Sequence, residues 1–338
     1  MTAQISSKRR PLADSKRRLL AAGLRACLGA ALLSSAPWAL ADEAYPGQAI
    51  KMIIPFPPGG TLDTVGRTLA QKLSEQFGKP VIVENRPGGN ATIGPGAVAR
   101  SPADGYTLLF NASTFLTGPM ISTAVPYKIE KDFQPIALVA KAPLSVAVNK
   151  DLPFNDIKGM VQYAKANPGK MTFAVGSIAS AGHLSTEQLK GTTGINALIV
   201  PYKGTAPAFQ DLVGGQIDAF IDPVLGSLQY HKGGMLKVIA TTSKARIPVL
   251  PDVPTVAETL PGFEFFSWYG LWAPAGTPAA IVNRLNKEVN IALKSEALTK
   301  FSAQGLVIEP QSVDDFTKFQ KSEADKYQKI VKQADIRL

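Results

Sequence analysis

Residues 50–85 read IKMIIPFPPGGTLDTVGRTLAQKLSEQFGKPVIVEN. The apolar run Ile50–Pro55 has the length of a strand, and a Pro-Pro-Gly-Gly turn follows it closely. Beyond the turn, apolar residues recur every three or four positions as far as Phe77, which is the period of an amphipathic helix. Gly-Lys-Pro then ends the helix, and a second strand starts at Val81. This βαβ pattern predicts a parallel sheet with a right-handed crossover.

The same strand, polar loop and helix pattern continues along the chain and predicts an α/β fold. We expect further strands at Tyr106–Phe110, Ile136–Val139, Met171–Val175, Ala197–Val200, Ile217–Ile221 and Leu236–Ala240, and note an apolar stretch at Leu144–Val148. We expect helices from His183 onward and at Ala206–Val213, Ile281–Leu293 and Val313–Val331. Chain crossings near residues 142–148 and 263–270 suggest two lobes with a cleft. We assign residues 42–142 plus 267–338 to lobe 1 and residues 143–266 to lobe 2.

Ligands of open parallel sheets bind outside the carboxyl ends of the strands. The loops expected to face the cleft are therefore 56–61, 111–114 (with Asn111 and Ser113), 176–182, 202–206 and 222–227. Loops 56–61 and 176–182 are rich in small residues and precede helices, so backbone N–H groups and a helix N-terminus are open to a carboxylate or phosphate. The alternative is that they are plain turns, with Ser180 serving only as a helix N-cap. Asp222 either binds a ligand or accepts hydrogen bonds from backbone N–H groups.

Catalytic patterns have little support in this sequence. The two histidines, His183 and His231, are not at metal-ligand spacing, and there is no G-x-S-x-G or phosphate-binding P-loop motif. We expect no cofactor and no metal, and a structural or hydrogen-bonding role for His183 near the cleft. The Trp268-Tyr269 pair and Trp272 are expected in the core between the lobes, where one of them could reach a ligand.

The first 41 residues have the order of an export signal: a basic segment at 8–18, an apolar segment at Ala26–Leu33 and a small-x-small motif ending at Ala41. The Arg17-Arg18 pair resembles a twin-arginine signal, and the general export route stays open as the alternative. We expect cleavage near Ala41 and a periplasmic mature protein.

The only cysteine is Cys27, inside this leader, where a lipidation site is the less favoured interpretation because Arg25 lies within the motif. Cleavage after Ala41 leaves no cysteine, and hence no disulfide or thiol nucleophile.

Overall composition excludes disorder and weakens a nucleic-acid role. The chain is 45% hydrophobic and 18% charged, enough for a large core. Its 36 basic and 26 acidic residues give a formal net charge of +10. Seven of the basic residues and one acid lie in residues 1–41, so the remaining 297 residues carry about +4. We therefore expect no nucleic-acid partner.

From Tyr45 to Leu338 the sequence resembles the Bug-type (TctC-like) receptors, the substrate-binding proteins of tripartite tricarboxylate transporters. The matching stretches, in the family's order, are YPGQAIKMIIPFPPGG, KPVIVENRPGGN, SPADGYTLLF, VPYKGTAPAFQDLVGGQID, LPDVPTVAETLPGFE and GLWAPAGTPAAIVNRLN. The resemblance implies a type II periplasmic binding protein fold whose two α/β lobes close around a small organic carboxylate. It implies a monomer that delivers this acid to membrane transporter subunits. A sensor subunit that presents the ligand to a membrane histidine kinase is the alternative.

The resemblance also implies that the loops at Phe56–Thr61 and Ser177–His183 hold the ligand, largely through backbone groups and water. The family's ligand-binding positions fall in this sequence on Gly59, Gly60, Asp63, Ser180, His183, Tyr202, Gly204, Thr205 and Asp222. Two departures matter. Leu62 stands where the family has a small residue, so we expect it to crowd or line the pocket. Ile178 lies where Gly-Asn-Gly is common, so we expect a less polar site and a ligand with an apolar or aromatic body rather than citrate.

Overall fold

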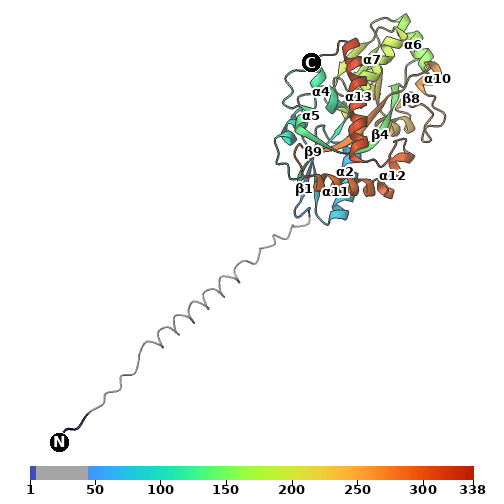
Figure 1. Cartoon of the computed structure of the whole chain (residues 1–338). Helices are drawn as coiled ribbons and strands as arrows, with labels where there is room; N and C mark the ends of the chain where they lie inside the picture. Colours follow the sequence, from blue (N-terminus) through green and yellow to red (C-terminus); the bar gives the residue numbers. More distant parts are fainter. Residues whose placement is uncertain (5–44) are drawn as a thin grey trace. The chain divides into compact units, whose positions relative to one another are not determined.

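The computed structural model describes residues 1–4 and 45–338 (Figure 1). The chain divides into two units, Met1–Tyr45 and Pro46–Leu338. The described residues of the first unit form no helix or strand. Apart from residues 1–4, the leader predicted at 1–41, with Cys27 and the cleavage site at Ala41, lies outside the described residues. Everything below concerns the second unit.

The described strands join into one mixed sheet. Their order is β2-β1-β3-β9-β4-β7-β5-β6, with β8 paired to β4. The β1–β2, β1–β3, β5–β6 and β5–β7 pairs are parallel, and the pairs that involve β4 or β9 are antiparallel. The strands are β1 (Ile50–Ile54), β2 (Val81–Asn85), β3 (Thr107–Ala112), β4 (Phe133–Asn149), β5 (Thr172–Val175), β6 (Leu198–Pro201), β7 (Ala219–Pro223), β8 (Leu236–Thr241) and β9 (Phe266–Pro274).

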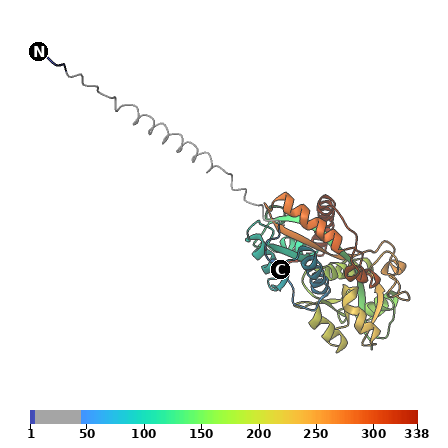
Figure 2. The ribbon, with the colours of Figure 1, turned by 90° about the horizontal axis from the view of Figure 1, so that it is seen from below.

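Helices pack around these strands, and the view from below shows them on more than one side (Figure 2). Helix α13 runs along β4 and also contacts α4 and α7 (Figure 1). The helices are α2 (Thr61–Phe77), α3 (Ile93–Ala99), α4 (Thr114–Ile121), α5 (Ile129–Asp132), α6 (Ile157–Ala166), α7 (Ala181–Thr193), α8 (Thr205–Val213), α9 (Val224–Lys232), α10 (Val256–Thr259), α11 (Ala279–Ala292), α12 (Glu296–Ala303) and α13 (Val313–Gln333).

Strand β4 belongs to both halves of the sheet. Its first part, up to Pro143, pairs with β9, and its second part, from Leu144, pairs with β7 and β8. We call the half that contains β1, β2, β3 and β9 lobe 1, and the half that contains β5, β6, β7 and β8 lobe 2. The carboxyl ends of the parallel strands in each lobe lead into the loops that form the site.

The βαβ unit predicted from residues 50–85 is confirmed. Helix α2 buries the predicted stripe, including Val65, Leu69 and Leu73, and ends at Gly78, whose φ of 62° is the left-handed conformation of a helix C-cap. The predicted strands and helices of the second half are also confirmed, within a few residues. The structure differs from the prediction in two strands: β4 extends well beyond the predicted Ile136–Val139 and takes in the apolar stretch Leu144–Val148, and β9 was not predicted as a strand.

Strand β9 occupies the middle of the sheet, and its two faces serve different purposes. Trp268 and Trp272 are fully buried, and their indole N–H groups donate to Tyr327 and Gln320 of α13 at 2.9 and 2.7 Å. Side chains alternate across a strand, so Tyr269 points to the opposite face from its Trp268 neighbour. The two tryptophans therefore form core, as expected, and Tyr269 is free to serve the site.

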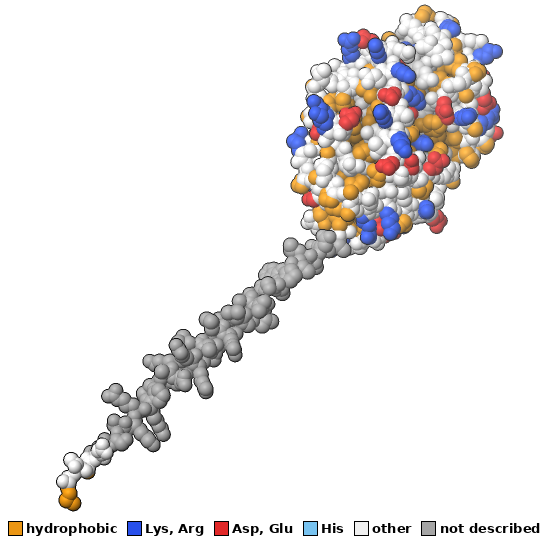
Figure 3. Space-filling model, in the orientation of Figure 1, with side chains coloured by type: hydrophobic (Ala, Val, Ile, Leu, Met, Phe, Trp, Pro, Cys, Tyr) orange, Lys and Arg blue, Asp and Glu red, His pale blue; other side chains and the backbone are white. Residues whose placement is uncertain are grey.

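The face drawn in Figure 3 carries mixed charge, with Lys and Arg side chains lying among Asp and Glu side chains. In the part of the chain that the structure describes, no helix is both long enough and apolar enough to cross a bilayer.

Candidate functional site

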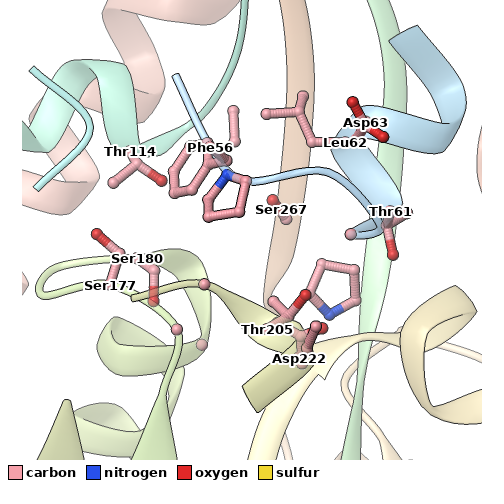
Figure 4. Close-up of a pocket in the computed structure, with 18 of the residues that line it drawn as sticks. Phe56, Thr61, Leu62, Asp63, Thr114, Ser177, Ser180, Thr205, Asp222 and Ser267 are labelled. Atoms are coloured by element: carbon pink, nitrogen blue, oxygen red, sulfur yellow. The ribbon is translucent and has the colours of Figure 1, made fainter. Parts of the chain in front are cut away.

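A pocket lies where the loops of the two lobes meet (Figure 4). It holds about 740 Å³ of empty space, part of it open to solvent. Phe56, Leu62 and Thr114 reach it from lobe 1, and side chains of lobe 2, including Ser177 and Asp222, face them (Figure 4). All five loops predicted to face the cleft contribute to the lining, and β9 adds Ser267 and Tyr269.

The first loop, between β1 and α2, is held in shape by Asp63. Gly59, with a φ of 96°, donates its backbone N–H to the Asp63 carboxylate at 3.1 Å, a backbone conformation that suits glycine. Asn85 donates to both Asp63 Oδ1 and the Phe56 carbonyl at 2.9 Å. Asp63 therefore organises the loop, although it also lines the pocket.

The carboxylate of Asp63 is ionised in this setting. Burial raises its pKa, but the hydrogen bonds from Arg67, Asn85 and Gly59, together with the Arg67 charge, bring the pKa below the ordinary value. The Arg67 Nε lies 3.0 Å from Oδ2. Because these partners occupy both carboxylate oxygens, little of the Asp63 charge is left for a ligand.

The second loop, between β5 and α7, is tied down by His183. The Ser180 hydroxyl accepts the His183 N–H at 3.3 Å, so the predicted N-cap is confirmed. The His183 Nδ1 accepts the N–H of Ala179 at 2.9 Å, where Ala179 has a φ of 56°. Nε2 lies 3.8 Å from Glu187. Both ring nitrogens thus face protein groups, the hydrogen-bonding role expected of this residue.

Close backbone approach brings the start of α7 against β7. A Cβ atom at Gly182 would lie 2.0 Å from the Ile221 carbonyl oxygen, so only glycine fits there. This contact places the first turn of α7 next to Asp222, the residue that follows Ile221.

The third loop, between β6 and α8, contributes Gly204 and Thr205 to the pocket wall. The neighbouring Tyr202 does not reach the pocket, because its hydroxyl donates to Asp211 at 2.6 Å. Burial, with the hydrogen bond and charge of Asp211, raises the pKa of Tyr202 to about 12. Tyr202 is therefore a neutral hydrogen-bond donor that fastens α8 to its loop.

Hydrogen bonds join the two lobes beside the pocket. Asn90, in the loop after β2, accepts from the Ser177 hydroxyl at 2.6 Å and from the Ile178 N–H at 3.0 Å. Its amide nitrogen donates to the Ile178 carbonyl at 3.0 Å. The Thr117 hydroxyl of α4 donates to the Ala179 carbonyl at 2.9 Å. The structure therefore shows the lobes in contact at the second loop.

Five helices of the described chain begin at the pocket wall. The lining includes Thr61, Thr114, Ala181 and Thr205, the first residues of α2, α4, α7 and α8, and Pro223, which precedes α9. Of these helices only α7 has a side-chain cap; the others have none. Unbonded N–H groups and the positive ends of helix dipoles favour an anion.

Three buried polar atoms in this wall have no hydrogen-bond partner within the described chain: Thr61 Oγ1, Asp222 Oδ2 and the Tyr269 hydroxyl. The Tyr269 hydroxyl faces those of Ser267 and Thr61 without a hydrogen bond of ordinary geometry. Burial raises the pKa of Asp222 well above its ordinary value. A buried polar group without a partner costs free energy, so these atoms mark where a ligand or water completes the site.

The structure brings eight of the thirteen predicted ligand-binding residues into the lining: Phe56, Gly60, Asp63, Ser177, Ser180, Gly204, Thr205 and Asp222. The other five are outside the lining: Gly59, Asn111, Ser113, His183 and Tyr202.

Each of these five has a physical reason to lie elsewhere. Gly59, His183 and Tyr202 hold loop geometry through the hydrogen bonds given above. Asn111 precedes the lining residue Ala112 on β3 and therefore points to the opposite face. Ser113 is buried, and its hydroxyl faces Tyr327.

Several lining residues were not among the thirteen predicted ligand-binding residues, for example Thr114, Lys203, Ser267 and Tyr269. Thr114 lies in the loop 111–114 that was expected to face the cleft, although it was not singled out there. Ser267 required knowledge that β9 passes the pocket, and no sequence motif marks it.

Leu62 and Ile178, the two apolar residues at which the sequence departs from the family pattern, take different places in the structure. Leu62 lines the pocket, as expected. Ile178 does not: its side chain packs against the hydrophobic core, so the expectation that it makes the site less polar was wrong. Among the residues described, no group of three or more His, Cys, Asp or Glu side chains is placed to hold a metal ion.

Comparison with known proteins agrees with this architecture. Residues 65–336 match the family described as tripartite tricarboxylate transporter family receptor. The chain is 36% identical to Protein BugT of Bordetella pertussis over 300 residues, covering 88% of this chain and 92% of BugT.

Solved structures with the same two-lobe fold are also similar. The chain is similar to Rpa4515 of R. palustris, solved with adipate, at 34% identity and a TM-score of 0.84, covering 87% of this chain and 99% of that one. It is similar to MatC of Rhodopseudomonas palustris, solved with malate, at 29% identity and a TM-score of 0.80, covering 85% and 100%. The resemblance inferred from sequence is confirmed, and the chain belongs to the receptor family of tripartite tricarboxylate transporters.

Proposed function

We propose that this receptor binds a small organic carboxylate, of the size of a dicarboxylate, between its lobes and delivers it to the membrane subunits of a tripartite transporter. The observation that carries the proposal is the convergence of five helix N-termini on one pocket, four of them without a side-chain cap. Their N–H groups suit a carboxylate oxygen. The adipate and malate bound by the two similar proteins support this class of ligand.

The affinity rests on N–H dipoles and bridging water. Among the described residues that line the pocket, Lys203 is the only one with a cationic side chain, and it is exposed. Hydrogen bonds from backbone N–H groups and through ordered water therefore replace an ion pair. Phe56 and Leu62 supply an apolar wall, which favours a ligand with an apolar or aromatic body over citrate.

Binding works by lobe closure. We propose lobes at residues 42–142 plus 267–338 and at residues 143–266, with the hinge where β4 changes partners between Pro143 and Leu144. The acid binds the closed state better and shifts the population toward it. The protein acts as a monomer and releases its cargo chemically unchanged.

We further propose that the leader directs export to the periplasm and is removed near Ala41, by the twin-arginine or the general route. The family match favours transport over a sensor role.

The experiment is a thermal-shift panel on the exported protein purified from periplasm, after unfolding and refolding to remove any carried-over ligand. The panel contains mono-, di- and tricarboxylates, aromatic acids, amino acids and phosphate. A ligand at 100 times its Kd stabilises by about 2.7 kcal/mol, which raises Tm by about 5–10 °C. We expect a shift for one class of carboxylate. No shift with any carboxylate, or a shift with phosphate alone, contradicts the proposal.

A further inference from the structure

Asp222 is the next-to-last residue of β7 and lies in the pocket wall, 6% exposed, with Oδ2 unpartnered in the described chain. Its backbone carbonyl oxygen accepts a hydrogen bond from the Ser145 hydroxyl at 3.2 Å. The carboxyl group itself has no ion-pair partner among the described side chains. An ionised carboxylate in such a place is costly.

The titratable groups that share the pocket do not neutralise Asp222. Helix α2 contributes Asp63, whose negative charge is already paired with Arg67. From the loop before α8 comes Lys203, which is exposed. From β9 comes Tyr269, a neutral phenol whose pKa burial raises. The lining residues supplied by β3, α4 and α7 are uncharged.

Nearby unpartnered hydroxyls indicate that this corner receives part of the ligand. Thr61 and Tyr269, residues that are 6% and 1% exposed, line the same pocket as Asp222, and their hydroxyl oxygens are buried. These three groups come from α2, β9 and β7, so both lobes contribute. Two adjacent carboxylates resist joint ionisation, whereas a carboxylic acid beside a carboxylate forms a short, strong O–H···O⁻ hydrogen bond.

We propose that Asp222 is protonated in the loaded receptor and donates this hydrogen bond to a carboxylate oxygen of the cargo, beside the hydroxyls of Thr61 and Tyr269. This inference rests on the proposed function, because it requires an anionic ligand in the pocket. It selects carboxylates against ligands that would place an ammonium group here, since a protonated Asp222 offers an ammonium no charge. Burial, which raises the pKa of Asp222, acts in the same direction.

If Asp222 must be protonated to bind the cargo, the affinity falls as pH rises. Below the pKa of Asp222 in the empty receptor, the proton is already present and Kd is constant. Above that pKa, binding must take up a proton, so Kd rises by about tenfold for each pH unit. A receptor that instead used an ionised Asp222 against a cationic group would bind more tightly as pH rises.

The test is calorimetric titration of adipate and of malate into the refolded receptor from about pH 5 to about pH 9, in two buffers of different ionisation enthalpy. We expect proton uptake in the upper part of this range, with Kd rising there. Asp222→Asn should give a flat Kd profile and no proton uptake. Asp151→Asn, which removes an exposed carboxylate outside the pocket, should reproduce the wild-type profile.

Each outcome bears on the proposal separately from the proposed function. Proton release on binding, or a Kd that falls as pH rises, overturns the role of Asp222 but leaves the receptor a carboxylate binder. If neither acid binds, the carboxylate that shifts Tm in the panel replaces them; if none does, both proposals fall. The number of protons taken up on binding is measured on the wild-type protein, so this test does not depend on whether Asp222→Asn folds.

Discussion

The side-chain amide of Asn90 accepts a hydrogen bond of 2.6 Å from the hydroxyl of Ser177, across the junction between the two lobes. The same amide bonds both the N–H and the carbonyl of Ile178 at 3.0 Å. One lobe 1 side chain therefore holds the second loop of lobe 2 without lining the pocket itself. In the proposed lobe closure, this contact stabilises the closed state independently of the ligand.

Removing the Asn90 side chain should weaken ligand binding. Asn90 has a φ of 51°, so Asn90→Gly deletes the amide without backbone strain. Loss of the three hydrogen bonds costs the closed state at least about 1.5 kcal/mol, which is a Kd at least roughly 10-fold higher, measured by calorimetry. Asn196→Ala, at an exposed position, is the control. A variant with wild-type affinity would show that Asn90 does not stabilise closure.

His183 should matter through its ring acceptor rather than through charge. In His183→Ala the buried N–H of Ala179 loses its partner, which costs about 1–3 kcal/mol in the free energy of unfolding. In His183→Asn the Oδ1 atom can take the place of Nδ1 and should recover much of that loss. Urea unfolding measures both. Equal stability of the two variants would refute this role.

Asp63 should make stability depend on pH at the acid end. Its pKa is lowered in the folded protein, so its stabilising contribution is present above the unfolded value of about 3.9 and is lost as pH falls through the folded value. Asp63→Asn should lower the free energy of unfolding by about 1–3 kcal/mol at neutral pH. The deficit should shrink below about pH 4. A deficit that does not change with pH would contradict the ionised state of Asp63.

Local patterns were sufficient to predict much of the fold. The stripe from Leu62 to Phe77 and the turn residues on either side of it give α2 and its strands, because helix period and helix stops are local properties. Strand β9 was missed because it is central and antiparallel, buried on both faces, and so shows no alternation of polar and apolar residues. Only Ile136–Val139 of the long strand β4 was predicted, because Lys141 and Pro143 interrupt its apolar run.

The site was predictable where it depends on loops that end strands, and less so where it depends on side-chain direction. Thr205 and Asp222 follow from strand ends and line the pocket as predicted. Asn111 also lies at a strand end, but side chains alternate between the two faces of β3, so the Asn111 side chain points away from the pocket. His183 and Tyr202 are adjacent to the pocket, yet their hydrogen bonds to Ala179 and Asp211 direct them to the protein. Such pairings depend on tertiary contacts that sequence spacing does not reveal.

The most direct test of the carboxylate pocket compares two tryptophan variants of α8. Ala206 and Gln210 are both exposed, and only Ala206 lines the pocket. The measurement is calorimetric titration of the carboxylate that gives the largest thermal shift. Ala206→Trp should fill the pocket and raise Kd by at least about 100-fold, equivalent to about 2.7 kcal/mol, whereas Gln210→Trp should bind as wild type does. Wild-type affinity in folded Ala206→Trp would place the ligand elsewhere and contradict the account.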